Sequence, residues 1–118
     1  MRQVEVDAML ELGEITDRGI EEVWALGPFG AGNPPPLFAA MNVEVAAAPV
    51  IMKEKHLRVT VRQNGRTLTL KSWNSAGRAA ELTAGARVDV AFALEEDTYS
   101  AARGYPGWAA MLRDFRGA

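Results

Sequence analysis

The side chains best suited to chemistry in this sequence are cationic and aromatic, and they gather near its centre. Residues 53–78 carry seven Lys and Arg side chains against one carboxylate, a net charge of +6. Residues 1–44 sum to −6 and residues 79–118 to −2, so the formal net charge of −2 for the whole chain hides the asymmetry. A short basic segment inside an acidic chain indicates a polyanionic partner. The alternative is a well-solvated hairpin that binds nothing.

The residue inventory excludes several classes of active site. The chain has no cysteine, which excludes disulfides, thiolate zinc sites and cysteine nucleophiles. His56 is the only histidine, which excludes HExxH zinc sites and multi-histidine metal clusters. The acidic run Glu95-Glu96-Asp97 could hold a cation, but such a run at a strand end is more often a solvated turn. These residues argue against an autonomous hydrolase.

A pair of alternating runs around Asn64-Gly65 predicts the element that positions the cations. Asn-Gly between such runs is typical of a two-residue type I′ hairpin. The register then pairs Arg58 with Lys71 and His56 with Trp73. Because side chains alternate across a sheet, one face collects an apolar set for the core: Leu57, Val59, Val61, Leu68 and Leu70. The other face collects a polar and aromatic set: His56, Arg58, Thr60, Arg62, Thr67, Thr69, Lys71 and Trp73.

This second face has the chemistry that unpaired nucleic acid needs. Arg58 directly opposite Lys71 is a like-charge pair, which phosphates lying across it would stabilise. An exposed Trp73 offers a ring on which any base can stack. The alternatives are that Trp73 lies under the following helix and that His56 only ends a strand. The candidate nucleic-acid contacts, two of them in the loop before the last strand, are Arg58, Lys71, Trp73, Arg62, His56, Lys55, Lys53, Arg66, Tyr99 and Arg103.

The remaining elements predict a mainly β chain. The length of 118 residues suits one domain with its own core. We expect a helix at about 16–26, then a loop rich in Pro and Gly. Strands follow at about 42–52, 56–63, 66–73, 87–94 and 108–115, with a short helix at 75–82. A helix between the third and fourth of five strands is typical of an OB barrel. A small SH3-like barrel or an open α+β sheet would give a similar string.

Four stretches of the sequence carry a resemblance to a known family. The segment 26–38, LGPFGAGNPPPLF, resembles the loop that introduces the C-terminal OB domain of RecJ-type single-strand-specific DNA exonucleases. That family reads L-x-P-F-G-x-G-N-P-x-P-x-F there. Lys53 to Arg58, KEKHLR, is similar to the family's next strand opening, and Trp73-Asn74 and Leu112-Arg113-Asp114 match later positions. The family pattern departs after Tyr99, where a Gly is usual, so we expect a loop of different shape.

The resemblance implies a part in a larger protein. It divides the chain into residues 1–38, an N-terminal strand and helix with a linker loop, and residues 39–118, the OB domain. It implies that single-stranded DNA is the partner and that the parent degrades such DNA from its 5′ end in recombination and repair. The catalytic domains, with a DHH-type Mn²⁺ or Mg²⁺ site, are expected upstream of Met1. No DHH motif occurs in this chain, so we expect no catalytic residue and no cofactor here.

Other partners and the compartment are expectations of the same kind. The upstream domains and a single-strand-binding protein are expected partners, and a membrane is not. No apolar run reaches the ~20 residues of a membrane span, and Met1–Glu5 lacks a signal-peptide core. The default setting is therefore cytoplasmic. The alternative function is a docking module for protein partners or for other domains of the parent.

Overall fold

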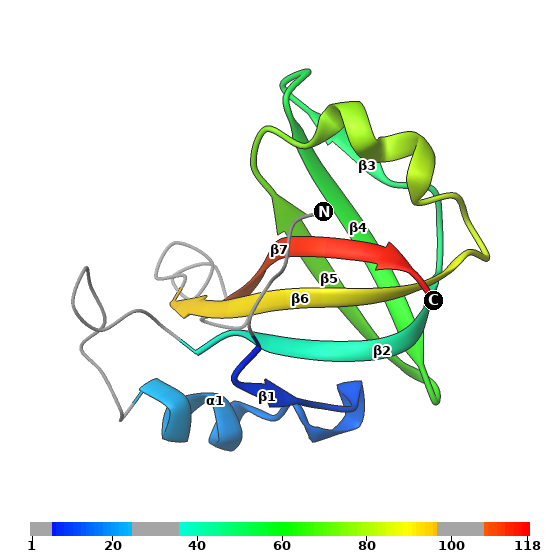
Figure 1. Ribbon diagram of the computed structural model, residues 1–118. Helices are drawn as coiled ribbons and strands as arrows, with labels where there is room; N and C mark the ends of the chain where they lie inside the picture. Colours follow the sequence, from blue (N-terminus) through cyan, green and yellow to red (C-terminus); the bar gives the residue numbers. More distant parts are fainter. Residues whose placement is uncertain (1–5, 25–35, 97–107) are drawn as a thin grey trace.

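The computed structural model describes residues 6–24, 36–96 and 108–118, with all their side chains except those of residues 17, 22–24 and 96. It is mainly β, with seven strands in one sheet and little helix (Figure 1). The strands are β1 (Ala8–Met9), β2 (Phe38–Val45), β3 (Val50–Met52), β4 (His56–Gln63), β5 (Arg66–Ser72), β6 (Arg87–Glu96) and β7 (Trp108–Gly117). The helices are η1 (Leu12–Glu14), α1 (Asp17–Trp24) and η2 (Ala76–Glu81).

Five of the strands close into a ring, and this confirms the predicted OB fold. Neighbours follow the order β2, β6, β7, β5, β4, and the additional pairing of β2 with β4 completes the circle. β5 pairs with β7 in parallel, while the other contacts in the ring are antiparallel. η2 lies between the third and fourth strands of the ring, where an OB barrel has its helix. Closing the ring leaves the barrel itself without free edges.

The hairpin of β4 and β5 forms in the register expected from Asn64-Gly65. Seven pairs run from Leu57 opposite Ser72 to Gln63 opposite Arg66. Asn64 and Gly65 both have positive φ, at 52° and 79°, as a type I′ turn requires. Each member of the predicted apolar face is buried: Leu57, Val59, Val61, Leu68 and Leu70. The alternation of apolar and polar residues was therefore enough to predict that the opposite, polar face points outward.

The segment before β2 is packed onto the barrel. Leu12, Ile15 and Ile20 are at most 8% exposed and belong to the same core cluster as the barrel strands. β1 pairs in parallel with β2 and extends the sheet beyond the ring. The Gln63 side chain joins the two parts, because its Nε2 donates to Met41 O and its Oε1 accepts from Leu12 N. Helix α1 and β1 lie together below β2 in Figure 1.

Several boundaries differ from those expected. The strand expected at 42–52 is two strands, because β2 begins at Phe38, ends at Val45 and is followed by a break before β3. β3 then turns back and pairs with β4 rather than continuing β2. β5 ends at Ser72, one residue before Trp73, and the helix at 75–82 is a 3₁₀ helix at 76–81. At the N-terminus the structure has a short strand at Ala8–Met9. Helix α1 is described over Asp17–Trp24, and residues 25 and 26 of the expected helix lie outside the described residues.

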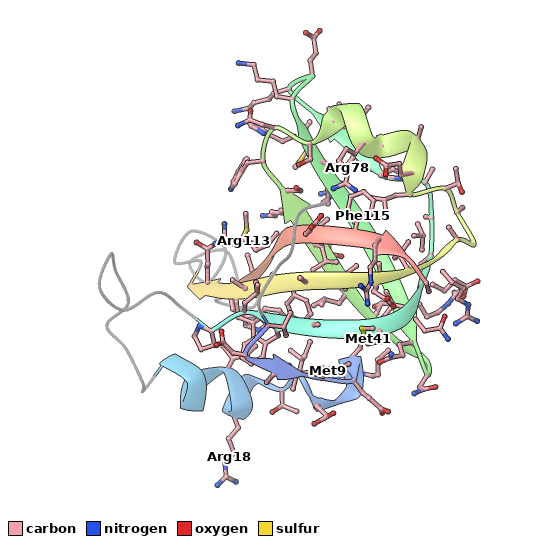
Figure 2. All side chains as sticks on the ribbon, viewed as in Figure 1. Met9, Arg18, Met41, Arg78, Arg113 and Phe115 are labelled. Carbon is pink, nitrogen blue, oxygen red and sulfur yellow. The ribbon has the colours of Figure 1, made fainter. Side chains whose placement is uncertain are left out.

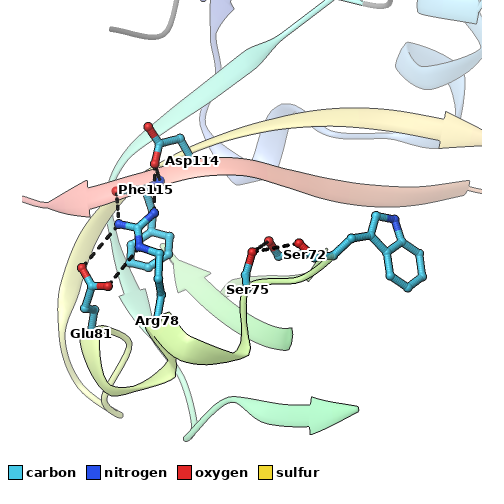
Figure 3. Close-up of polar contacts among 7 residues, drawn as sticks. Ser72, Ser75, Arg78, Glu81, Asp114 and Phe115 are labelled. Atoms are coloured by element: carbon cyan, nitrogen blue, oxygen red, sulfur yellow. Dashed lines mark hydrogen bonds and ion pairs between the residues drawn. The ribbon is translucent and has the colours of Figure 1, made fainter. Parts of the chain in front are cut away.

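Arg78 of η2 holds this helix against the barrel through contacts with β7. Its guanidinium lies 3.9 Å from the centre of the Phe115 ring and forms ion pairs with Glu81 and Asp114 at 3.0 and 3.1 Å (Figures 2 and 3). The pKa of Arg78 is raised, chiefly because it hydrogen-bonds Glu81, while burial opposes this. Arg78 is therefore a structural residue. Among the helices described, none is long and apolar enough to cross a membrane.

Candidate nucleic-acid interface

The outward face of the hairpin carries two cations side by side. Arg58 of β4 and Lys71 of β5 are directly opposite in the register, Arg58 exposed and Lys71 half-buried. Across residues 6–24, 36–96 and 108–118, no described carboxylate lies within 4 Å of either one. No described carboxylate therefore offsets the like-charge repulsion of this pair. An anion bridging the two would relieve that repulsion.

Two lysines extend the charge at one end of this face. Lys53 and Lys55 lie in the turn between β3 and β4, and both are exposed. Neither has a carboxylate within 4 Å in the described part of the chain. Lys55 N donates to Met52 O at 3.2 Å, and the two central residues, Lys53 and Glu54, have φ of 54° and 62°. The turn lies just before His56, which contacts Trp73, so Lys53 and Lys55 are at the same end of the hairpin as Trp73.

Trp73 is open to solvent and held in place by His56. The indole is 56% exposed, so it does not lie under η2. Its ring centre is 4.5 Å from that of His56, with the two planes at 90°. His56 Nδ1 accepts a hydrogen bond from Asn74 N at 3.1 Å. The imidazole thus fixes both the indole and the turn after β5, and an exposed indole surface remains for a ligand.

The cations near the Asn64-Gly65 end of the hairpin are already bound to other groups of the protein. Arg62 forms an ion pair with Glu44 at 2.8 Å across the contact between β2 and β4. This holds the pKa of Glu44 below its ordinary value, first through the hydrogen bond from Arg62 and then through its charge. The Arg66 guanidinium donates to Ile15 O at 3.5 Å. Of the basic segment, Arg62 is thus paired with Glu44, and Arg78 with Glu81 and Asp114. These carboxylates lie outside residues 53–78, so the sum of +6 did not include them.

Sequence reasoning did not include an apolar strip beside these cations. Val50 of β3 is opposite Arg58, and Met52 is opposite His56, so both point to the outward face. Val50 is 47% exposed. The signal was present in the alternation at positions 50 and 52, but it was assigned to a continuation of the preceding strand. The pairing of β3 with β4 makes this strip continuous with Arg58 and Lys71.

Two of the predicted contacts, Tyr99 and Arg103, lie outside the described residues. The same holds for most of the PFGAGNPPP segment and for Asp97 of the acidic run. Glu95 of that run is paired with Arg113 at 3.7 Å. Among the described side chains, no group of three or more His, Asp or Glu is placed to hold a metal ion.

Comparison with known proteins places this geometry in a family. The family described as RecJ OB domain matches residues 6–105 of the chain. A comparison with curated proteins gives no match. Among solved structures, the chain is similar to one described as a replication protein A heterotrimer bound to ssDNA, with a TM-score of 0.49 and 12% identity. It is also similar to a putative aspartyl-tRNA synthetase from Leishmania major Friedlin, with a TM-score of 0.41 and 8% identity.

These structural matches are partial in both directions. The first covers 68% of this chain and 57% of that chain, and the second covers 84% of this chain and 25% of that chain. At such identities and scores, neither bears on what this chain binds.

Proposed function

This chain belongs to the RecJ OB domain family, and we propose that it binds single-stranded DNA on the outward face of its β4–β5 hairpin. The observation that carries the proposal is the unneutralised pair Arg58 and Lys71 beside the exposed indole of Trp73. Cations for phosphates next to a ring for bases are the two components of binding without sequence preference.

The binding mechanism follows from what each side chain can offer. Arg58 and Lys71 share phosphate oxygens, which removes their mutual repulsion and releases counterions from the DNA. Lys53 and Lys55 attract the same backbone at the end of the hairpin. Trp73 stacks on one base, and Val50 and Met52 provide an apolar surface beside it. Stacking and phosphate contacts do not read base edges, so the site is expected to tolerate any sequence.

The role of the parent protein is part of the same proposal. We propose that the domain holds a single strand for a 5′-to-3′ exonuclease acting in DNA recombination and repair in the cytoplasm. The hydrolytic step, with Mn²⁺ or Mg²⁺, would belong to domains outside this sequence. A single-strand-binding protein is a proposed further partner of the parent.

The proposal is tested by reversing the two central charges. The double variant Arg58→Glu with Lys71→Glu is expected to lose more than about tenfold in affinity for a labelled oligothymidine, because two phosphate contacts become repulsive. Thermal unfolding should change little, since a like-charge pair replaces another on an accessible face. The matched control is Arg113→Glu with Arg116→Glu, two β7 cations already paired with carboxylates.

The same titration identifies the interaction as electrostatic. For the unmodified chain, the logarithm of the binding constant should fall linearly with the logarithm of salt, by about 0.7 for each phosphate contacted. Binding by the Arg58 and Lys71 variant equal to that of its control would overturn the assignment of the site. No binding by the unmodified chain at low salt would overturn the function itself.

One observation favours a second candidate, a docking module. Val50 and Ile51 are 47% and 52% exposed on β3, and β3 has only β4 as a neighbour in the described sheet. An apolar strand at a free edge is suited to contact another domain or protein. Under this reading, substitution of Ile51 by Lys would impair assembly with the other domains and leave oligonucleotide binding unchanged.

A further inference from the structure

A polar pocket lies at the opposite end of the hairpin from Trp73. It has a volume of about 390 Å³ and is bounded by β2, the Asn64-Gly65 turn and the start of β6. Its size falls within the range of about 300–1,000 Å³ found for small-molecule sites. The proposed contacts with single-stranded DNA do not use it.

Three charged residues line up across this pocket. Glu44 of β2 is opposite Arg62 of β4 on one side and opposite Arg87 of β6 on the other. Both hydrogen bonds from Arg62 go to Oε1 of Glu44, at 3.2 and 2.8 Å. Oε2 of Glu44 therefore accepts from no donor among the described residues. Two guanidinium groups against one carboxylate leave one positive charge in excess.

The other lining groups are also free to bind. Arg87 donates only one long hydrogen bond, from Nη1 to Asn42 O at 3.4 Å, and no described carboxylate lies within 4 Å of it. The side-chain amides of Asn42 and Asn64 have no hydrogen-bond partner within residues 6–24, 36–96 and 108–118. The pocket thus offers amide donors and acceptors, one carboxylate acceptor and a guanidinium.

This mixture fits one nucleotide. A base edge needs donors and acceptors together, which Asn42, Asn64 and the free oxygen of Glu44 supply. A phosphate needs a cation with several N–H groups, which Arg87 supplies. A purely anionic ligand would not use the carboxylate, and an apolar ligand would find little apolar surface here.

We propose that this pocket is a second nucleotide subsite of the same single strand, with Arg87 as its phosphate contact. The inference rests on the proposed function. Arg58 and Arg62 are alternate outward residues four positions apart on β4, or about 13 Å at about 3.3 Å per residue. A strand held at Arg58 and Lys71 must therefore extend about 13 Å further along β4 to reach the pocket, so a longer strand fills both places more readily.

The test uses oligonucleotide length. Affinities of the 118-residue chain are measured for oligothymidines of about 4 and about 16 nucleotides, the limits of site size for OB folds. Arg87→Gln should lower the affinity for the longer strand about threefold or more and reduce its salt slope by about 0.7, as for one lost phosphate contact. Its effect on the shorter strand should be smaller, because a strand of about 4 nucleotides has fewer ways to contact Arg58, Lys71 and Arg87 at once.

Two further variants make the result specific. Asn42→Gly removes the amide and suits the positive φ of 53° at this position, so the fold is retained while affinity for the longer strand falls. Arg116→Gln removes an exposed cation outside the pocket and controls for net charge. If Arg87→Gln and Asn42→Gly match this control at both lengths while the Arg58 and Lys71 variant loses binding, the subsite is wrong and the function stands. If the unmodified chain binds neither strand, both fall.

Discussion

Arg58 and Arg62 occupy equivalent outward positions on one strand, yet their surroundings differ. Arg62 is bound by Glu44, whereas Arg58 faces Lys71 and has no described carboxylate near it. Sequence alternation predicted that both side chains point outward, but it could not predict which of them is paired with a carboxylate. The partner of Arg62 is 18 residues away and the Asp114 that binds Arg78 is 36 away, so only the folded sheet shows which cations remain free.

The most informative single side chain is Trp73. Replacing it with Ala should weaken oligonucleotide binding by about 1–3 kcal/mol, since that is the usual contribution of one base–aromatic stack. Unfolding should be little affected, because the indole is more than half exposed. Fluorescence anisotropy measures the first and thermal denaturation the second.

Trp73→Phe serves as the control, because it keeps a smaller ring against His56 and should retain part of the affinity. If the Ala and Phe variants both bind as tightly as the unmodified chain, the indole does not stack on a base.

Among the elements, the two hairpin turns show what sequence can and cannot predict. The turn at Asn64-Gly65 is predictable from its residue types, because Asn and Gly adopt positive φ readily. Lys53 and Glu54 adopt positive φ as well, although nothing in their chemistry favours it. The β3–β4 hairpin was therefore missed and its first strand joined to β2. It exists because pairing with β4 stabilises it enough to hold two strained residues.

This strain predicts a stabilising substitution. Glu54→Gly should raise the free energy of unfolding by about 1 kcal/mol, because glycine adopts positive φ without steric cost. It also removes the only carboxylate of residues 53–78, so oligonucleotide affinity at low salt should rise. Urea denaturation and anisotropy measure the two effects.

Glu54→Gln separates the effect on stability from the effect on affinity, because it removes the charge and keeps a side chain at the strained position. It should reproduce the gain in affinity without the gain in stability. Equal stability of the Gly and Gln variants would show that the turn stores no strain.

For the whole molecule, the N-terminal segment and the barrel share one core cluster. A boundary at residue 38 would separate Leu12, Ile15 and Ile20 from the core cluster that they share with the barrel. The resemblance of residues 26–38 to the family's linker suggested that boundary, and local sequence does not reveal which distant surface an apolar residue covers. The core was predictable where alternation was strict, in β4 and β5, and less so where contacts come from the N-terminal segment.

Substitution of Gln63 tests whether the N-terminal segment and the barrel unfold together. Gln63→Ala should lower the free energy of unfolding by about 1–3 kcal/mol, because Leu12 N and Met41 O would lose their partner in a partly buried place. If the segment and the barrel unfold together, far-ultraviolet circular dichroism and tryptophan fluorescence should both report one urea transition, shifted to lower denaturant. Gln63→Glu keeps the acceptor for Leu12 N, so its loss should be smaller. A variant in which residues 7–20 exchange amide hydrogens rapidly while the barrel strands stay protected would instead show that the two parts unfold separately.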